Sequence, residues 1–458
     1  MIKIYNSLTK QEQEFVPITP GKVKMYVCGI TVYDYCHIGH ARSALAFDVV
    51  ARYFRYLGYE VDYVRNITDI DDKIINRANE THQSCDEVTK KFIAAMLEDE
   101  AALKMQAYNQ APRATDYVGE IVKMIDQLVA KGNAYVADNG DVYYSIPSFK
   151  DYGKLSKRDL EQLRAGERVV VVAEKHDPLD FVLWKLAKPG EPSWPSPWGA
   201  GRPGWHSECS VMSSLCLGEQ IDIHGGGMDL MFPHHENEIA QAEAINGKPF
   251  VNIWMHNGFL MVNDEKMSKS LKNFFTIREV LEKHDPETVR FLYLSVHYRK
   301  PLSYSEAQLA QARKSLERFY VAIRNVPAGE PLKNSVYEQE FQKAMNSDFN
   351  VPEALAVLHE LATELNQLKS QQDMLAVSYA ALLVKLGNVL GILYENPEQF
   401  LQANTAAVDA ANIEELIAKR NQARKDKDWP LADQLRGELD ALDIVLEDGA
   451  AGTTWRKK

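Results

Sequence analysis

The fold is decided by residues 23–68, VKMYVCGITVYDYCHIGHARSALAFDVVARYFRYLGYEVDYVRNIT. The opening VKMYVCGI alternates in polarity and ends at a Cys-Gly pair, which predicts a strand that runs into a loop. Apolar residues then recur at helical spacing, at Ala44, Phe47, Val50 and Phe54. The closing VDYVRNIT predicts a second strand. A strand, a helix and a strand in this order predict a parallel sheet covered by helices.

The composition is that of an ordinary globular protein. The chain has 458 residues, which at roughly 150 residues per domain suggests about three domains. Hydrophobic residues make up 45% and charged residues 25%, a balance that excludes a disordered or collagen-like chain. Lysine and arginine number 52 against 64 aspartates and glutamates, giving a net charge of −12. This charge argues against a generally basic nucleic-acid coat and leaves a local basic patch open.

Cysteine usage and apolar runs indicate the compartment. Five cysteines in this length exclude a disulfide scaffold, and the odd number leaves at least one thiol unpaired within the chain. The first residues lack the cationic and apolar regions of a secretory signal. The stretch that comes closest to a membrane span, YAALLVKLGNVLGILY, contains Lys385 and Asn388. We therefore expect a cytoplasmic protein with no membrane partner.

Beyond the opening unit the pattern changes several times along the chain. Residues 86–131 have an amphipathic helical pattern, whereas residues 133–187 have hairpin and strand character, which predicts an inserted or connecting module. From Lys188, KPGEPSWPSPWGAGRPGWH carries five of the nineteen prolines and predicts a boundary loop. QIDIHGGG then predicts another strand, and PHHENEIAQAEAI a helix after it.

The last third of the chain is predicted to be helical. From about residue 303 apolar residues form helical stripes, and Asn350 with Glu353 is typical of a helix start. The stripes consist of Leu309, Ala312, Leu316, Phe319 and Ile323, and of Leu355, Leu358, Ala362, Leu365 and Leu368.

Four residues together offer the donor set of a metal site: Cys28, Cys209, His234 and Glu238. His234 and Glu238 are four residues apart, so that on a helix both side chains lie on one face. Two thiolates, one imidazole and one carboxylate suit zinc. Taken singly, each cysteine is more simply interpreted as a small buried hydrophobe, and the alternative for His234 is a capping or core histidine. Spacing alone leaves both interpretations open because the donors come from three distant segments.

Three motifs are candidates for nucleotide contacts. His37-Ile38-Gly39-His40 stands where a loop gives way to a helix, and helix N-termini attract phosphate, although a surface turn would have the same pattern. KMSKS places Lys266 and Lys269 in a serine-rich loop, which offers mobile positive charge to a polyphosphate or forms a solvated basic loop. In GGGMD the glycines let a flat ligand lie on the backbone and Asp229 can hold a ribose hydroxyl, although a glycine triplet is also a common loop element.

The combination of these motifs resembles one family. CHIGH after a strand–helix junction, GGGMDLMFPHHENE and KMSKS, in this order, are similar to class I aminoacyl-tRNA synthetases. Cys28, GWHSECS and HHENE make the chain resemble the cysteinyl-tRNA synthetases specifically. The resemblance covers essentially the whole chain, from MYVCGITVYDYCHIGHAR to the terminal LEDGAAGTTWRKK. Met228 and Lys272 are departures, because the family often has a small polar residue at the first position and glycine at the second.

The resemblance implies an activity and its partners. It implies a ligase that joins L-cysteine to tRNA(Cys) with ATP through a cysteinyl-adenylate, accompanied by Mg²⁺, and that acts as a monomer. It further implies one Zn²⁺ per chain, held by the four candidate metal ligands and recognising the substrate thiol. The catalytic residues that it implies are His37, His40, Lys266 and Lys269, the nucleotide-binding residues Gly39, Gly227, Asp229 and Lys269, and the cysteine-binding residues Gly29, Thr68 and Trp205.

Two groups of residues lie outside the motifs proper. One is a supporting layer of imidazoles, for which ordinary polar packing is the alternative: His206, His224, His235 and His256. The other is a candidate anticodon contact, for which a solvated helix face with a buried tryptophan is the alternative: Arg420, Arg424, Lys427 and Trp429.

The resemblance also implies an α/β architecture with a Rossmann-like parallel-sheet catalytic domain, an inserted connective-peptide module, a C-terminal helical bundle and a small anticodon-binding domain. The expected boundaries are 1–119 and 205–255 for the two catalytic halves, 120–204 for the insertion, 256–305 for a junction module with KMSKS, 306–400 for the bundle and 401–458 for the anticodon-binding domain.

Three rival functions remain. An ATP-dependent cysteine ligase acting on a small amine would share the core but would not require the long helical C-terminal part. A catalytically silent RNA- or thiol-binding relative would not need all the motifs intact. A nucleotidyltransferase shares the HxGH signature but lacks the cysteine, histidine and glutamate set.

Overall fold

The computed structural model describes residues 1–458 apart from 162–173, 263–264, 267–273, 403–406, 450–451 and 458. The chain divides into two compact units. The first consists of Met1–Ala312, Glu338–Val357 and Val389–Ile392, and the second of Arg313–Tyr337, Leu358–Asn388 and Leu393–Lys458.

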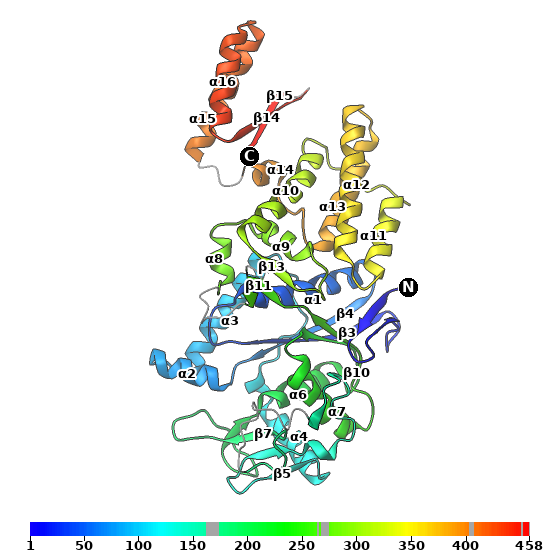
Figure 1. Cartoon of the computed structure of the whole chain (residues 1–458), viewed down its shortest axis with the longest axis vertical. Helices are drawn as coiled ribbons and strands as arrows, with labels where there is room; N and C mark the ends of the chain where they lie inside the picture. Colours follow the sequence, from blue (N-terminus) through cyan, green and yellow to red (C-terminus); the bar gives the residue numbers. More distant parts are fainter. Residues whose placement is uncertain (162–173, 263–264, 267–273, 403–406, 450–451, 458) are drawn as a thin grey trace. The chain divides into compact units, whose positions relative to one another are not determined.

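The first unit is built on a parallel sheet of four strands in the order β10-β9-β3-β4 (Figure 1). These strands are β3 (Lys22–Thr31), β4 (Glu60–Thr68), β9 (Ile221–Gly227) and β10 (Val251–Asn257). Helix α1 (Ile38–Tyr56) connects β3 to β4. The strand–helix–strand unit and the parallel sheet predicted from the sequence are therefore confirmed.

Helices cover both faces of this sheet, α1 on one and α6 (Trp205–Leu217) with α7 (Glu236–Asn246) on the other. Met212 of α6 and Ile239 of α7 share a buried core with Tyr26 of β3. On the opposite face Gly225 leaves room for α1, because a Cβ at this position would lie 2.2 Å from the Phe47 ring. Strand residues alternate between faces, so the neighbouring His224 points back to α7.

The predicted insertion is an antiparallel sheet in the order β5-β6-β7-β8. Ile121 and Leu128 of α4 (Val118–Ala130) pack with Tyr144 and Trp184 of this sheet in a second core, which Val211 of α6 and Ala240 of α7 share. The elements of this region are η1 (Ala114–Tyr117), β5 (Ala134–Val136), β6 (Val142–Tyr144), η2 (Ile146–Ser148), β7 (Phe181–Leu186) and β8 (Gly201–Pro203).

The helix expected over residues 86–131 is interrupted. Helix α3 (Cys85–Ala102) ends early, and the next segment runs along the edge of β4, where Asn109 donates its N–H to the Tyr63 carbonyl at 2.7 Å. Ile67 of β4 donates to the Pro112 carbonyl at 2.9 Å. The amphipathic pattern did not reveal this break, because the break is caused by a distant contact. The segment after α3 forms backbone hydrogen bonds with the edge of β4, which would otherwise be unpaired.

The remaining elements of the first unit surround the sheet. They are β1 (Lys3–Asn6), β2 (Gln11–Glu14), α2 (Asp72–Thr81), η3 (Met231–His235), β11 (Leu260–Val262), β12 (Glu265–Lys266), α8 (Ile277–Leu281), α9 (Pro286–Leu294) and β13 (Leu302–Tyr304). Arg290 of α9 is completely buried and pairs with Asp48 of α1, which also accepts from Arg52 at 2.8 Å. This ion network joins α9 to the helix that follows β3.

The described C-terminal part is helical, as predicted, apart from a final hairpin that the sequence analysis did not predict. Its elements are α10 (Glu306–Ile323), α11 (Val336–Asn346), α12 (Val351–Ser370), α13 (Leu375–Leu390), α14 (Pro397–Leu401), α15 (Ala407–Lys425), α16 (Trp429–Ala441), β14 (Ile444–Gly449) and β15 (Gly452–Lys457). Both predicted apolar stripes are buried. The predicted helix start is also present, since the Asn350 side chain accepts from the Glu353 N–H at 3.4 Å.

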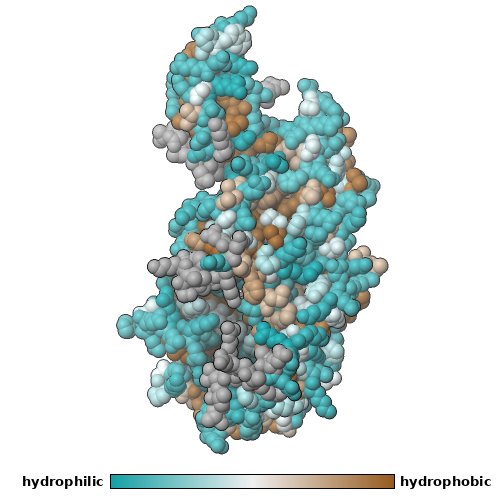
Figure 2. Space-filling model, viewed as in Figure 1, coloured by the Kyte–Doolittle hydropathy of each residue, from teal (hydrophilic) through white to brown (hydrophobic). Residues whose placement is uncertain are grey.

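The surface view in Figure 2 is predominantly hydrophilic on the face it shows, with hydrophobic residues in scattered patches. Among the helices that the structure describes, none combines the length and the apolar character needed to cross a membrane.

Candidate active site

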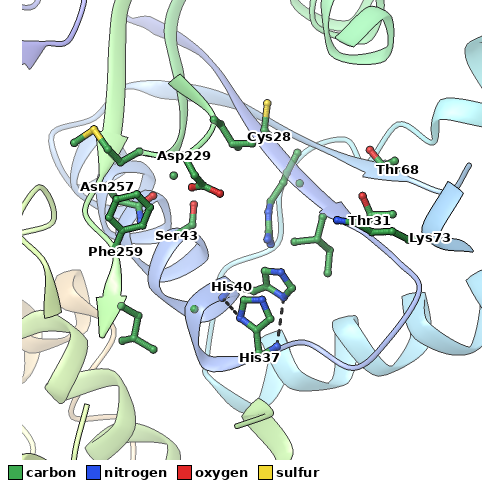
Figure 3. Close-up of a pocket in the computed structure, with 18 of the residues that line it drawn as sticks. Cys28, Thr31, His37, His40, Ser43, Thr68, Lys73, Asp229, Asn257 and Phe259 are labelled. Atoms are coloured by element: carbon green, nitrogen blue, oxygen red, sulfur yellow. Dashed lines mark hydrogen bonds between the residues drawn. The ribbon is translucent and has the colours of Figure 1, made fainter. Parts of the chain in front are cut away.

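A pocket of about 490 Å³ opens at the carboxyl edge of the parallel sheet, where ligands of open α/β sheets bind (Figure 3). Residues at or just beyond the ends of all four strands line it, together with the first turn of α1. In the view of Figure 3, Cys28 and Thr68 lie toward one end of the pocket and His37 and His40 toward the other. Cys28 of the candidate metal site and both histidines of the candidate phosphate site therefore line one pocket.

His37 and His40 cap helix α1 reciprocally. The Nδ1 of His37 accepts the His40 backbone N–H at 3.2 Å, and the Nδ1 of His40 accepts the His37 N–H at 3.3 Å. The two rings stack with their centroids 3.5 Å apart. Burial, with His37, Arg65 and Lys73 nearby, lowers the pKa of His40 well below its ordinary value. A neutral ring whose Nδ1 accepts carries its proton on Nε2, so His40 offers an Nε2–H donor.

The four predicted metal ligands lie together in a buried cluster. One donor atom from each of Cys28, Cys209, His234 and Glu238 lies within 4.8 Å of the others. Cys28 Sγ lies 3.7 Å from Cys209 Sγ and 3.6 Å from Glu238 Oε1, and His234 Nε2 lies 3.1 Å from the same carboxylate oxygen. A parallel strand, helix α6 and the η3–α7 turn each supply part of this set. The described chain thus contains a buried cluster suited to a metal ion.

Protonation in this cluster is governed by burial. Burial, followed by the neighbouring Cys209 and Glu238, raises the pKa of the Cys28 thiol well above its ordinary value. Burial and other imidazoles lower the pKa of His234 well below its ordinary value. The His234 ring is therefore neutral and has a nitrogen lone pair for a metal ion.

The four histidines expected to support the cluster surround it. His206 Nδ1 lies 3.0 Å from His234 Nδ1, and His224 Nε2 lies 2.9 Å from Glu238 Oε2. His235 Nδ1 lies 2.8 Å from His256 Nε2, whose ring in turn contacts Ser7 Oγ at 2.8 Å. His224 and His235 also form a second possible metal-binding group with Cys28 and Glu238. Sequence spacing had not suggested this overlap.

The predicted cysteine-binding residues line the pocket beside the metal cluster. The Trp205 ring stacks on the His234 ring with centroids 4.2 Å apart. Gly29 lies at a register irregularity of β3, where a Cβ would lie only 1.7 Å from the Asn66 carbonyl oxygen. Thr68 ends β4, and its hydroxyl donates to Glu208 Oε2 at 2.9 Å. Burial raises the pKa of the Glu208 carboxyl well above its ordinary value.

The predicted nucleotide-binding residues Gly39, Gly227 and Asp229 also line the pocket. A Cβ on Gly227 would lie 2.4 Å from the Asp229 carboxylate, so glycine lets this carboxylate lie against the backbone. Met228, a departure from the family pattern, lines the pocket as well and is 37% exposed.

The KMSKS motif lies largely outside the described residues. Lys266 ends β12, and its side chain, like Lys269 and the departure at Lys272, is outside the part of the chain that the structure describes. The segment that follows the motif contacts the first turn of α1. The Phe274 ring lies 5.1 Å from the His37 ring, and Ile38 donates its N–H to the Phe275 carbonyl at 3.0 Å.

Several pocket residues escaped the sequence analysis. They are Thr31, Tyr33, Ser43, Arg65, Lys73, Asn257, Phe259 and Phe274. Thr31, Tyr33 and Arg65 stand at or near the ends of two predicted strands, so the rule that parallel sheets bind ligands at their carboxyl edge would have found them. Asn257 and Phe259 lie at or just beyond the end of β10, a strand that the sequence analysis did not predict.

The candidate anticodon-binding residues differ in whether their side chains are free to contact RNA. Asp448 accepts from Arg420 at 2.9 Å and from Arg424 at 2.7 Å, so both arginines are engaged within the C-terminal module. Trp429 is 57% exposed at the start of α16. The buried tryptophan of this module is Trp455, which packs with Ile413 and Leu439.

Comparison with known families places the chain in a class. The model of the tRNA synthetases class I (C) catalytic domain matches residues 14–314, the DALR domain model matches 340–394, and the cysteinyl-tRNA ligase anticodon binding domain model matches 410–456. The chain is therefore a class I aminoacyl-tRNA synthetase by family and fold.

Curated relatives narrow the family further. A cysteine–tRNA ligase of Tolumonas auensis is 57% identical over 462 residues and covers 100% of both chains. One of Azotobacter vinelandii is 58% identical over 456 residues and covers 99% of both. The chain belongs to the cysteine–tRNA ligase family.

Solved structures of distant relatives share the fold. The methionyl-tRNA synthetase of Mycobacterium tuberculosis in complex with methionyl-adenylate has a TM-score of 0.58 at 13% identity, with 86% of this chain and 94% of that chain covered. A ternary LeuRS–tRNA–LeuAMS complex from Agrobacterium radiobacter K84 has a TM-score of 0.59 at 13% identity, with 95% of each chain covered.

Proposed function

We propose that the chain joins L-cysteine to tRNA(Cys) in two steps. In the first, cysteine and Mg²⁺-bound ATP give cysteinyl-adenylate and pyrophosphate. In the second, the terminal adenosine of the tRNA takes the cysteinyl group and AMP leaves. The observation that carries this proposal is a single pocket lined at one end by Cys28, which belongs to a buried thiol, imidazole and carboxylate cluster, and at the other by paired histidines on a helix N-terminus.

We propose one zinc ion per chain, held by Cys28, Cys209, His234 and Glu238. A tetrahedral zinc ion with Zn–S bonds of about 2.3 Å and Zn–N or Zn–O bonds of about 2.05 Å separates two sulfurs by about 3.8 Å, sulfur from oxygen by about 3.6 Å, and nitrogen from oxygen by about 3.3 Å. The corresponding distances in the cluster are 3.7, 3.6 and 3.1 Å. Donor type and spacing both support zinc at this position.

This metal would account for selection between cysteine and serine. The two substrates differ by one atom, and an ordinary pocket rejects an isostere only weakly. When bound, zinc supplies a Lewis acid that takes a thiol as the thiolate far more readily than it takes an alcohol. Cys28, which lines the pocket and belongs to the cluster, would place the substrate sulfur there. The Trp205 ring would form the wall of this part of the pocket.

The activation step requires charge stabilisation rather than a general base. The cysteine carboxylate is already ionised, so it attacks the α-phosphorus of ATP without losing a proton. We propose that His37 and His40 donate hydrogen bonds to the phosphates and that Lys266 and Lys269 neutralise the departing pyrophosphate. The hydrogen bonds to Nδ1 of each ring support this role, because they leave Nε2 as the proton-bearing nitrogen.

The other pocket residues would position the two substrates. We propose that Gly39 and Gly227 let the nucleotide lie close to the backbone and that Asp229 holds a ribose hydroxyl. Gly29 and Thr68 would hold the amino-acid backbone of cysteine. Trp429, exposed in the C-terminal module, would stack on an anticodon base.

We further propose the domain division given above, with catalytic halves 1–119 and 205–255 separated by the insertion 120–204 and followed by the junction 256–305, the bundle 306–400 and the anticodon-binding domain 401–458. The antiparallel sheet β5-β6-β7-β8, which is separate from the parallel sheet, supports the insertion. We propose a monomer, as the family resemblance implies. A reducing cytoplasm would suit the five cysteines, all of which lie in the described ranges without a disulfide.

Two assays test the function. Cysteine-dependent exchange between ATP and pyrophosphate is expected without tRNA, and charging of unfractionated tRNA with cysteine is expected when tRNA is added. Serine serves as the control and is expected to support neither reaction at comparable concentration. Exchange without charging would instead favour a cysteine ligase acting on a small amine, and the absence of exchange would favour a silent relative.

A further inference from the structure

We infer that Asn66 and Glu208 are positioning residues that make the Thr68 hydroxyl a hydrogen-bond acceptor for the α-ammonium group of the substrate. This inference rests on the proposed function and deepens it, because it explains how the pocket recognises the amino group separately from the thiol. Neither Asn66 nor Glu208 lines the pocket, so both would act through Thr68.

The three side chains form a short buried chain of hydrogen bonds. The Thr68 hydroxyl donates to Glu208 Oε2 at 2.9 Å, and Asn66 Nδ2 lies 3.4 Å from the same hydroxyl oxygen. All three residues are at most 3% exposed. Water is thus largely excluded from these contacts. Hydrogen bonds are stronger in such surroundings, so the two neighbours determine the direction of the Thr68 hydroxyl.

The orientation of the Asn66 amide is fixed by the backbone. Its Oδ1 accepts the Gly29 N–H at 2.8 Å. This contact lies where the pairing of β3 with β4 shifts in register, between Val27 and Ile30. An amide turned the other way would set its NH₂ group against this N–H, so Nδ2 has to face Thr68. Asn66 therefore links the two residues proposed to hold the backbone of cysteine.

The role of Glu208 follows from the hydrogen bonds that a hydroxyl can form. It donates one through its proton and accepts up to two through its lone pairs. Glu208 takes the proton, and its Oε2 can accept whether the carboxyl is ionised or carries its own proton on Oε1. Asn66 takes up one lone pair. The remaining lone pair of Thr68, whose side chain lines the pocket, can only accept, and an ammonium group is a donor with no lone pair (Figure 3).

The experiment separates recognition of the amine from recognition of the thiol. 3-Mercaptopropionate has the thiol and carboxylate of cysteine but no amine, and its Ki against cysteine is measured in the exchange assay beside the KM for cysteine. Glu208→Met keeps the length of the side chain but removes the acceptor, which frees the Thr68 proton to turn toward the pocket. We expect the KM for cysteine to rise about tenfold or more, with the Ki and the zinc content changed less than twofold.

Matched variants distinguish orientation from other roles. Glu208→Gln keeps an acceptor and is expected to stay within threefold of the wild-type KM, whereas a loss equal to that of Glu208→Met would mean that the charge acts directly. In a Thr68→Val background, Glu208→Met is expected to add less than threefold, because its partner is already absent. Ser210→Ala removes a buried hydroxyl from the same helix, bonded to the His206 carbonyl, and is expected to change neither constant.

The remaining outcomes are also decisive. If Glu208→Met does not fold, Asn66→Ala removes the other restraint and is expected to raise the ratio of KM to Ki at least threefold; an unchanged ratio would overturn the inference. A parallel rise of KM and Ki, or multiplicative effects in the double variant, would overturn it as well. Wild-type protein without cysteine-dependent exchange would overturn the proposed function and the inference with it, whereas normal wild-type exchange with an unchanged ratio in the variants overturns the inference alone.

Discussion

Gly29→Ala tests whether the close approach of β3 and β4 holds the metal cluster together. A Cβ at this position would lie 1.7 Å from the Asn66 carbonyl oxygen, whereas real Cβ contacts are essentially never closer than 3.0 Å. The backbone must therefore move by at least about 1.3 Å, the difference between these two distances. Such a shift would also break the 2.8 Å hydrogen bond from the Gly29 N–H to the Asn66 side chain.

The magnitude of the effect follows from these two losses. Overpacking of a tight site costs about 1–3 kcal/mol and a lost buried hydrogen bond about 0.5–1.5 kcal/mol, so the free energy of unfolding should fall by about 2–4 kcal/mol. For a domain of this size that loss lowers the melting temperature by roughly 5 °C or more. Cys28 is the residue before Gly29, and metal ligands tolerate displacements of only about 0.2 Å, so zinc content should fall with stability.

Thermal unfolding, zinc per chain by mass spectrometry and cysteine-dependent exchange measure the three consequences. Gly119→Ala is the matched control, because nothing lies within 4 Å of the added Cβ on helix α4. It should stabilise the protein by about 0.5–1 kcal/mol. A Gly29→Ala protein that melts within 1 °C of wild type and holds a full complement of zinc would refute the reasoning.

Three further predictions concern other parts of the first unit. Cys209→Ser should lose zinc and raise the KM for cysteine steeply, because an alcohol replaces a thiolate ligand; full metal content with a normal KM would remove the zinc hypothesis. Lys269→Ala should lower the rate of adenylate formation far more than it weakens cysteine binding, and unchanged exchange kinetics would argue against its role. Asp48→Asn should cost about 3 kcal/mol in urea unfolding at pH 7 because Arg290 and Arg52 lose their buried partner. Since these arginines lower the pKa of Asp48 despite its burial, its contribution is present above about pH 4 and lost as pH falls further, so the variant's deficit should shrink in acid.

Much of the architecture could be predicted because local patterns dictate it. The alternation and helical spacing of residues 23–68 define β3, α1 and β4, and the apolar stripes of α10 and α12 are buried as their period requires. The break after α3 could not be predicted in this way. Its cause is the edge of β4, which lies far away in sequence and takes the hydrogen bonds of residues 109–112.

The site shows the same division between local and distant information. The spacing of His234 and Glu238 already predicted that they share a face, but only the folded sheet brings Cys28 and Cys209 to within 3.7 Å of each other. Glu208 lies within the GWHSECS motif and Asn66 two residues before Thr68, but neither was predicted as a site residue, because the use of a buried amide or carboxyl becomes clear only when its partners are known. The side chains of KMSKS lie outside the described residues, so their roles stay predictions.

The arrangement of the pocket has a consequence for selectivity. Cysteine would present its thiol to the metal cluster, its ammonium group to Thr68 and its carboxylate to the phosphate end, and three separate parts of the chain form these contacts. Serine has the same ammonium and carboxylate groups, so Thr68 and the histidine pair cannot tell the two amino acids apart. Variants of Thr68 or Glu208 should therefore weaken activation of both by the same factor and leave their ratio intact. Variants of Cys209 should narrow that ratio, because the metal cluster alone would read the sulfur.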